Sequence, residues 1–183
     1  MRTKTVSLPG CFEIQPEIYR DDRGLFVKTF HVKFFEKNAL QTIWSEEYYT
    51  VSKLGVLRGL HFQLPPHDHE KLIFCISGKV LDVVVDLRKG APTFGEYVKI
   101  DLSAEKGNMI YIPKGMAHGF FCFSKEAILV YKVSSVYAPE FDSGIRWDSV
   151  GIDWPTDKPL ISERDRGLTK FNEFVSPFTY LDK

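Results

Sequence analysis

One short segment places a cation and a titratable base close together. Arg58 and His61 lie within residues 57–63, on either side of Gly59. Strict strand alternation would point these two side chains to opposite faces, but a bulge at the glycine would turn both into one cavity. The histidine could then exchange protons near neutral pH, and the arginine could hold an anion. A surface arginine beside a hydrogen-bonded core histidine is the alternative explanation.

Further acid–base groups occur later in the chain. His118 follows a Pro-Lys-Gly turn, Lys71 begins an apolar segment, and Tyr131 lies in the apolar run of residues 127–132. Gathered around one cavity with His61, these groups would suit proton transfer beside an anionic substrate. A buried tyrosine can equally be a core residue with a hydrogen-bonded hydroxyl group.

A metal site is a competing hypothesis. His67 and His69 form a His-x-His pair that could join His118 as transition-metal ligands. The pattern Gly-x5-Pro-x-Gly-x2-His, which ends at His118, resembles the second motif of the cupin superfamily, whose jelly-roll barrels often bind metals. By the first-motif spacing of that superfamily, Lys71 occupies the usual glutamate ligand position, and its ammonium group would repel a cation. We therefore expect no metal and no other cofactor.

The elements that must position these groups are short strands. Between residues 56 and 136, apolar or alternating runs are separated by turn residues. In residues 81–87 the leucines and valines at odd positions share one face, with Asp82 and Asp86 opposite. This pattern predicts an all-β fold, a cupin-type jelly-roll β-barrel with a few short peripheral helices.

The helices are expected at residues 31–40 and from Ser162, where an acid follows three residues later as in a capping box. The cysteines Cys11, Cys75 and Cys122 lack the spacing of a disulfide framework and are expected to be buried, reduced thiols. A catalytic cysteine is the alternative, but the apolar segments around the last two offer no adjacent cation that would lower a thiol pKa.

Length and charge limit the possible classes of protein. The 183 residues are enough for one sizeable core, so we expect a single domain over residues 1–183. The 24 Lys and Arg balance the 24 Asp and Glu, which argues against nucleic acid or a membrane surface as partner. The apolar runs are too short to span a bilayer, and no apolar signal segment follows Met1. A cytoplasmic protein is expected.

Several motifs together resemble one family. They lie at residues 55–63, 71–72, 82–88, 91–95, 112–120, 131–132 and 162–165. Their order and spacing are similar to those of the dTDP-4-dehydrorhamnose 3,5-epimerase family, metal-independent cupins of sugar-nucleotide metabolism. The resemblance implies an isomerase that acts on a nucleoside-diphosphate 4-keto-6-deoxyhexose, in deoxysugar biosynthesis for cell-surface polysaccharide such as the O-antigen of lipopolysaccharide. The keto group acidifies the protons on C3 and C5, because the carbanion left behind is delocalised as an enolate.

The resemblance also implies residue roles. His61 would be the base, Asp165 would orient it, Tyr131 would be the acid on the opposite face, and Lys71 would stabilise the enolate oxygen. The residues expected to contact the substrate are Arg23, Arg58, His118, Lys28, Glu46, Tyr48, Tyr19 and Gln63, the two arginines holding the diphosphate. Family members are dimers whose N-terminal region enters the neighbouring site, so a homodimer with an exchanged N-terminal segment is expected.

Three departures from the family pattern concern the substrate. Lys28 stands where an acid is usual, residues 46–50 read Glu-Glu-Tyr-Tyr-Thr instead of Gln-Asp-Asn-x-Ser, and His69 replaces a glutamine or glutamate. The nucleoside, thymidine or cytidine, and inversion at C5 in addition to C3 therefore stay open. The alternatives are a C3-only epimerase of a CDP-linked 4-keto-6-deoxyglucose, a ketoisomerase, a metal-dependent cupin oxygenase or isomerase, and a non-catalytic sugar-binding barrel.

Overall fold

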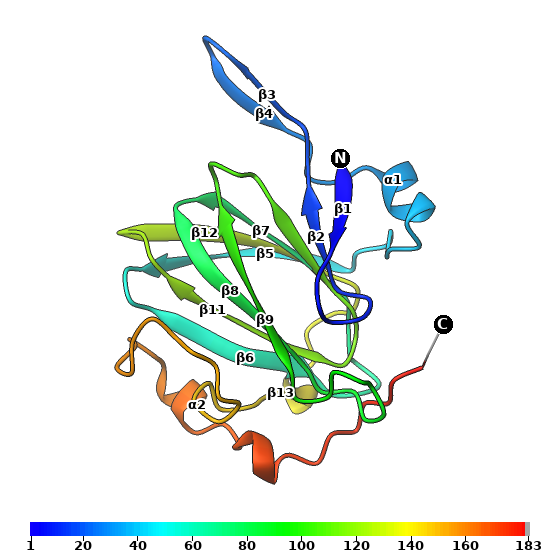
Figure 1. The fold of residues 1–183 in the computed structure, drawn as a ribbon, viewed down its shortest axis with the longest axis vertical. Helices are drawn as coiled ribbons and strands as arrows, with labels where there is room; N and C mark the ends of the chain where they lie inside the picture. The colour runs from blue at the N-terminus through cyan, green and yellow to red at the C-terminus, as the bar shows by residue number, and fades with distance from the viewer. Residues whose placement is uncertain (182–183) are drawn as a thin grey trace.

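Two antiparallel sheets lie face to face and enclose the main core (Figure 1). The computed structural model describes residues 1–181. The strands are β1 (Arg2–Thr5), β2 (Phe12–Gln15), β3 (Ile18–Asp21), β4 (Gly24–Val27), β5 (Glu46–Lys53), β6 (Leu57–Gln63), β7 (Lys71–Ser77), β8 (Lys79–Asp86), β9 (Tyr97–Ser103), β10 (Met109–Ile112), β11 (Met116–Cys122), β12 (Glu126–Val133) and β13 (Asp142–Gly144). One sheet has the order β1-β2-β10-β7-β12-β5 and the other β13-β6-β11-β8-β9, while β3 and β4 form a separate hairpin. The predicted cupin-type jelly-roll barrel is confirmed.

Both faces of the central strands are covered, which explains their near-continuous burial. In β8 the predicted face of Leu81, Val83 and Val85 packs outward against the C-terminal part of the chain, including Trp154. The opposite face, which carries Asp82, points into the barrel with Val80 and Val84. Alternation was therefore predicted correctly, and the aspartate face is the interior of the barrel, not a solvated surface.

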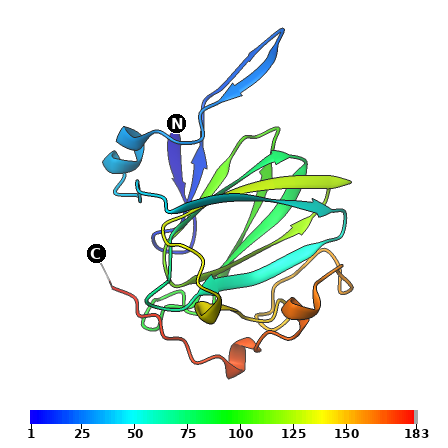
Figure 2. The same ribbon diagram turned by 180° about the vertical axis from the view of Figure 1, so that it is seen from behind.

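The helices are short and peripheral, as predicted. Helix α1 (Val32–Lys37) buries Phe35 against the outside of the six-stranded sheet. Helix α2 (Glu163–Arg166) begins at Ser162, whose side chain accepts a hydrogen bond from the Asp165 backbone N–H at 3.1 Å. Figure 2 shows α2 and the C-terminal segment outside the five-stranded sheet, below β6. Neither helix has the length and apolar character needed to cross a membrane, within the part of the chain that the structure describes. Two 3-10 turns, η1 (Pro139–Phe141) and η2 (Phe171–Glu173), lie in the connecting segments.

A bulge at Gly59 interrupts the pairing of β6 with β11. Arg58 lies opposite Phe120 and His61 lies opposite His118, so three steps along β6 match two along β11. Phe120 and His118 are two residues apart on β11 and share its interior face. Their partners Arg58 and His61 therefore both have Cβ atoms on the interior side of β6. The bulge expected from the glycine is confirmed.

Gly59 also has no room for a side chain. Its φ is +127°, and a Cβ would lie 2.5 Å from Cα of Gly119 and 2.9 Å from the His118 carbonyl oxygen. We expect Gly59→Ala to lower the free energy of unfolding by roughly 3 kcal/mol or more, because backbone strain and overpacking add. Gly24 has a similar φ of +125° with nothing within 4 Å, so Gly24→Ala isolates the strain alone, about 1–2 kcal/mol. Urea unfolding measures both; equal losses would contradict a role for the Gly119 contact.

The hairpin of β3 and β4 stands away from the barrel (Figure 1). Its side chains Tyr19, Leu25 and Phe26 are all more than half exposed, at 60%, 52% and 59%.

The three cysteines are free and buried, which confirms the expectation of reduced thiols. Burial raises the pKa of the Cys75 thiol to about 11, well outside the range of a reactive thiolate.

Candidate active site

A cavity of about 400 Å³ opens where several strand ends meet. The starts of β5 and β7 meet the end of β12 because these neighbouring strands are antiparallel, and the end of β6 lines the cavity from the other sheet. The lining residues are Glu46, Tyr48, His61, Phe62, Gln63, His69, Lys71, Val133, Tyr137, Asp142 and Arg164. The fold thus gathers five of the predicted site residues, Glu46, Tyr48, His61, Gln63 and Lys71, in one place.

His61 and Asp165 form a hydrogen-bonded pair on this cavity. Nε2 of His61 lies 2.8 Å from Oδ1 of Asp165, and Oδ2 of the same carboxylate accepts the Gly59 backbone N–H at 3.1 Å. An ionised carboxylate only accepts, so Nε2 carries the proton and Nδ1 holds a free lone pair. Nδ1 has no hydrogen-bond partner among residues 1–181 and is not buried. The arrangement is that of an oriented base.

The charge of Asp165 is held by its neighbours. Burial on its own would raise the pKa of this carboxyl group, but the hydrogen bond and charge interaction with His61, the Gly59 amide and Arg164 together lower it below the usual value. Nη1 of Arg164 lies 3.3 Å from Nε2 of His61. Both groups donate, so Arg164 contributes positive charge there and no hydrogen bond. Its Nη2 donates to Asp142 at 2.6 Å.

Lys71 brings a buried cation to the same cavity. Its side chain is only 6% exposed, and Nζ donates to the His61 carbonyl oxygen at 3.0 Å. Burial lowers the pKa of Lys71 to about 8, although the nearby charges of Asp142 and Asp82 favour the ammonium form. The group is therefore a cation at neutral pH, placed where an oxyanion would be stabilised.

Tyr131 lies against the cavity wall and keeps its proton. Its ring stacks on Tyr48 with centroids 4.9 Å apart and 12° between the planes, and its hydroxyl group lies 3.5 Å from Oγ1 of Thr50. Burial raises the pKa of Tyr131 far above its usual value, so the phenol is neutral and can act as an acid. Tyr48 lines the cavity and Tyr131 lies behind it.

His118 belongs to a second, fully buried pair. Its Nε2 lies 2.7 Å from Oδ2 of Asp82, and its ring meets the Tyr131 ring edge to face at 6.0 Å between centroids. Burial lowers the pKa of His118 and raises that of Asp82. Oδ1 of Asp82 is buried with no hydrogen-bond partner in the described part of the chain. His118 thus supports Tyr131 from within the barrel, and its predicted contact with substrate stays a prediction.

Other predicted contacts are arranged differently. Arg58 donates to Oγ of Ser52 at 3.0 Å and to the Val51 carbonyl oxygen at 3.2 Å, beside a separate pocket of about 280 Å³ behind Asp165. Gln63 lines the main cavity, but its amide nitrogen donates to loop carbonyl groups and its amide oxygen accepts the Ala138 N–H at 2.7 Å. Gln63 therefore fixes the loop beside the cavity.

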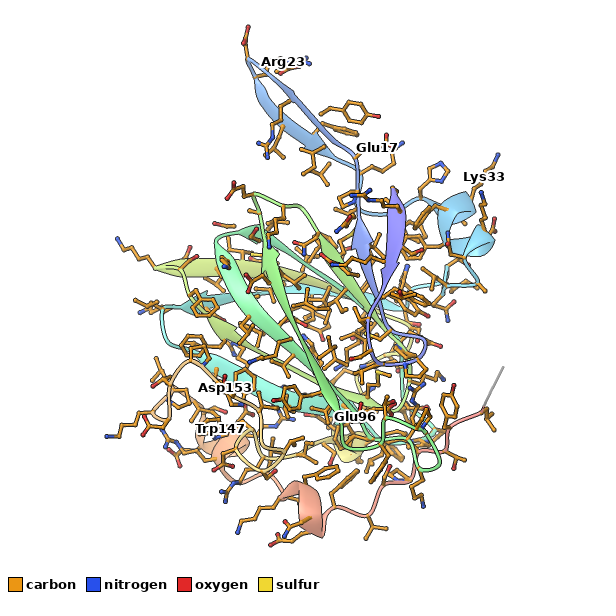
Figure 3. The ribbon with its side chains drawn as sticks, viewed as in Figure 1. Glu17, Arg23, Lys33, Glu96, Trp147 and Asp153 are labelled. Carbon is orange, nitrogen blue, oxygen red and sulfur yellow. The ribbon has the colours of Figure 1, made fainter. Side chains whose placement is uncertain are left out.

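The hairpin residues do not reach this cavity within one chain. Arg23 lies at the hairpin tip, where it pairs with Asp21 (Figure 3). Tyr19 and Lys28 line a separate pocket of about 280 Å³ at the hairpin base, next to α1. The contacts predicted for these three residues therefore require a second subunit.

The histidines considered as metal ligands do not converge. His67 packs on Phe141 with ring centroids 4.6 Å apart, and His118 is bonded to Asp82. Over residues 1–181 no group of three or more His, Cys, Asp or Glu side chains is arranged to hold a metal ion. The structure therefore does not bring His67, His69 and His118 together as one set of ligands in the described part of the chain.

Sequence reasoning did not assign Arg164 or Asp82. Arg164 directly precedes Asp165, so the first turn of a helix that delivers a carboxylate to the base could have drawn attention to it. Asp82 lies among valines on a strand face, and a lone acid on the interior face of a barrel is a signal of a buried partner. That partner, His118, is 36 residues away, which no local pattern reveals.

Comparison with known proteins finds relatives over nearly the whole chain. The family model described as dTDP-4-dehydrorhamnose 3,5-epimerase matches residues 5–173. A dTDP-4-dehydrorhamnose 3,5-epimerase of Methanothermobacter thermautotrophicus is 44% identical over 172 residues, which cover 91% of this chain and 92% of the relative.

Solved structures agree with the sequence comparison. A dTDP-6-deoxy-D-glucose-3,5-epimerase of Legionella pneumophila, in complex with dTDP-4-keto-L-rhamnose, has a TM-score of 0.93 at 33% identity and covers 98% of this chain and 99% of its own. A 3'-monoepimerase of Streptomyces bikiniensis, in complex with dTDP-quinovose, has a TM-score of 0.86 at 33% identity, over 92% and 87% of the two chains. With the His61–Asp165 pair set in this barrel, the chain belongs to the dTDP-4-dehydrorhamnose 3,5-epimerase family.

Proposed function

We propose that the protein epimerises a nucleoside-diphosphate 4-keto-6-deoxyhexose at C3, with C5 as the second position to be tested. The observation that carries the proposal is the His61–Asp165 pair, whose Nε2 proton is fixed by a carboxylate while Nδ1 is open to a cavity that also holds Lys71. An oriented base beside a buried cation suits removal of a proton next to a carbonyl group.

The proposed reaction balances without a cofactor. Nδ1 of His61 takes the proton from C3, and the electrons of the C–H bond move through C4 onto the keto oxygen. The Lys71 ammonium group stabilises that oxygen. When the enolate collapses, Tyr131 returns a proton to the other face of the carbon, and the configuration is inverted. The tyrosinate and the imidazolium then exchange protons with solvent.

Thymidine is the default nucleoside, because the two solved relatives described above are named in complexes with dTDP-sugars. The replacement of the usual amide pair by Glu46 and Tyr48 keeps a CDP-linked sugar, inverted at C3 alone, as the alternative. Both nucleotides therefore belong in the test.

Deuterium incorporation tests the function. The protein is incubated in deuterated water with dTDP- and CDP-linked 4-keto-6-deoxyglucose, and the products are analysed by mass spectrometry and for configuration. Two deuterons with two inversions support the 3,5-reaction, and one deuteron supports exchange at a single position, which is C3 if the product is inverted there. No incorporation with either nucleotide contradicts an epimerase.

The charge of Lys71 predicts an alkaline limit. The ammonium form is present below its pKa of about 8 and is lost above it, so kcat/KM should fall about tenfold per pH unit on the alkaline side. The pH profile of Lys71→Gln is the control. Lys71→Gln should have a lower kcat/KM at neutral pH, and its kcat/KM should not fall near pH 8. If the fall near pH 8 persists in this variant, another group causes it.

We also propose a homodimer in which the hairpin of β3 and β4 enters the partner's site. The exposed aromatic side chains of Tyr19 and Phe26 and the position of Arg23 at the hairpin tip support it. Co-expressed His61→Asn and Arg23→Ala chains test this arrangement. If Arg23 acts across subunits, the mixed dimer has one complete site and recovers activity; without recovery, Arg23 acts in its own chain or not at all.

We also place the protein in the cytoplasm, because three buried free thiols suit a reducing compartment.

A further inference from the structure

His69 lines the cavity but has no role in the chemistry proposed above. It lies two residues before Lys71 and is partly buried. Its ring nitrogen Nδ1 lies 3.1 Å from Oγ of Ser135 and 3.2 Å from the amide nitrogen of Gln63. Both contacts are made by Nδ1. The role of the other ring nitrogen, Nε2, follows from which of the two nitrogens carries the proton.

We assign the proton of His69 from the groups around Nδ1. Oγ of Ser135 donates its only hydrogen to the His67 carbonyl oxygen at 2.7 Å, so toward Nδ1 it can only accept. The Gln63 amide nitrogen has four neighbours for its two hydrogens, the carbonyl oxygens of His67 at 2.9 Å and Val136 at 3.2 Å, Nδ1 of His69 at 3.2 Å and Oγ of Ser135 at 3.3 Å, and we assign the hydrogens to the two carbonyl oxygens. Nδ1 therefore carries the proton and donates to Ser135, which leaves a lone pair on Nε2.

Nε2 is open to the cavity. It has no hydrogen-bond partner within residues 1–181, and it is not among the buried polar atoms that lack one. Burial lowers the pKa of His69 to about 3, and the positive charges of Lys71 and Lys114 act in the same direction. The imidazole ring is therefore neutral near pH 7, and Nε2 accepts hydrogen bonds but does not donate them.

We propose that Nε2 of His69 accepts a hydrogen bond from the hydroxyl group on C3 of the substrate and selects sugars that carry it. The inference rests on the proposed function, which places the C4 oxygen at Lys71. His69 lies in the loop that leads into β7, two residues before Lys71, and both side chains line the same cavity, so we place a neighbour of C4 at His69. Of the two neighbouring carbons, C3 carries a hydroxyl group and C5 a methyl group. A site that hydrogen-bonds a substrate hydroxyl group discriminates against the analogue that lacks it.

Binding of ligands that do not react tests this role without turnover. The ligands are dTDP-6-deoxyglucose and its 3-deoxy analogue, with the CDP-linked pair in parallel, measured by isothermal titration calorimetry. We expect His69→Phe, which removes the acceptor and keeps a ring, to weaken binding of the 3-hydroxy ligand about 5- to 10-fold, the value of one neutral hydrogen bond. Binding of the 3-deoxy ligand should not change. His69→Gln, which offers an amide oxygen, should recover part of the loss.

The matched control is His67→Phe, because His67 lies in the same loop and packs on Phe141 outside the cavity lining. It should leave both affinities unchanged. Equal weakening of the two ligands by His69→Phe would indicate a loop effect and overturn the selection role, as would no weakening at all. If the wild-type protein binds neither nucleotide pair, the proposed function itself fails; binding without discrimination overturns only the inference about His69.

Discussion

His61→Asn is expected to lower the rate of epimerisation about 10³-fold or more, because it removes the Nδ1 lone pair that we propose takes the C3 proton. The asparagine side chain is too short to reach the position of Nε2 and loses the 2.8 Å bond to Asp165, but the Gly59 N–H still donates to that carboxylate, so the barrel and the position of α2 should be kept. Substrate binding should change little. The rate is measured together with the wash-in of deuterium, which should disappear in parallel.

His67→Asn is the matched control for the loss of an imidazole, since the His67 ring packs on Phe141 and does not line the cavity. Its rate should stay within about twofold of the wild type. If His61→Asn retained a tenth of the activity or more, another group would have to be the base, and the assignment of Nδ1 would be wrong.

Tyr131→Phe is expected to uncouple proton removal from inversion. The variant keeps the ring stacked on Tyr48 but lacks the proton that must be delivered to the opposite face. Formation of the epimer should fall about 10²- to 10³-fold. His61 can still remove the C3 proton and return one from its own face, so deuterium should enter without a change of configuration.

Tyr48→Phe is the companion variant, because Tyr48 is the other ring of the same stack and also lines the cavity. It should keep both exchange and inversion within about tenfold of the wild type. Normal epimer formation by Tyr131→Phe, or loss of inversion in Tyr48→Phe alone, would transfer the acid role to Tyr48.

The sequence predicts the parts of this protein that rest on local rules. The alternation in residues 81–87, the bulge at Gly59 and the helix start at Ser162 each follow from the chemistry of a few adjacent residues, and each is confirmed. The edge strand β5 was not predicted, because Glu46–Lys53 is mostly polar or exposed and its pairing with β12 is a long-range contact.

The site could be predicted from the sequence only in part. The segment 57–63 indicated a base and a cation on one strand, but the partner of His61 lies 104 residues away. In the sequence, only the family resemblance joins His61 to Asp165. Arg164 and the pair of Asp82 with His118 depend on three-dimensional contacts that neither composition nor periodicity encodes. The orientation of His69 depends on the hydrogen-bond donors and acceptors around Ser135, which come together only in the folded chain.

The carboxylate that orients His61 is not carried by either sheet. It comes from the first turn of α2, in a segment that packs on the outside of the five-stranded sheet and is joined to β6 by the Gly59 amide. A chain with complete sheets but with this segment undocked would have nearly the full β-sheet signal in circular dichroism and an unoriented base. Turnover is therefore a more sensitive measure of complete folding than the circular dichroism of the sheets. On storage or partial denaturation, activity should be lost before the β-sheet structure.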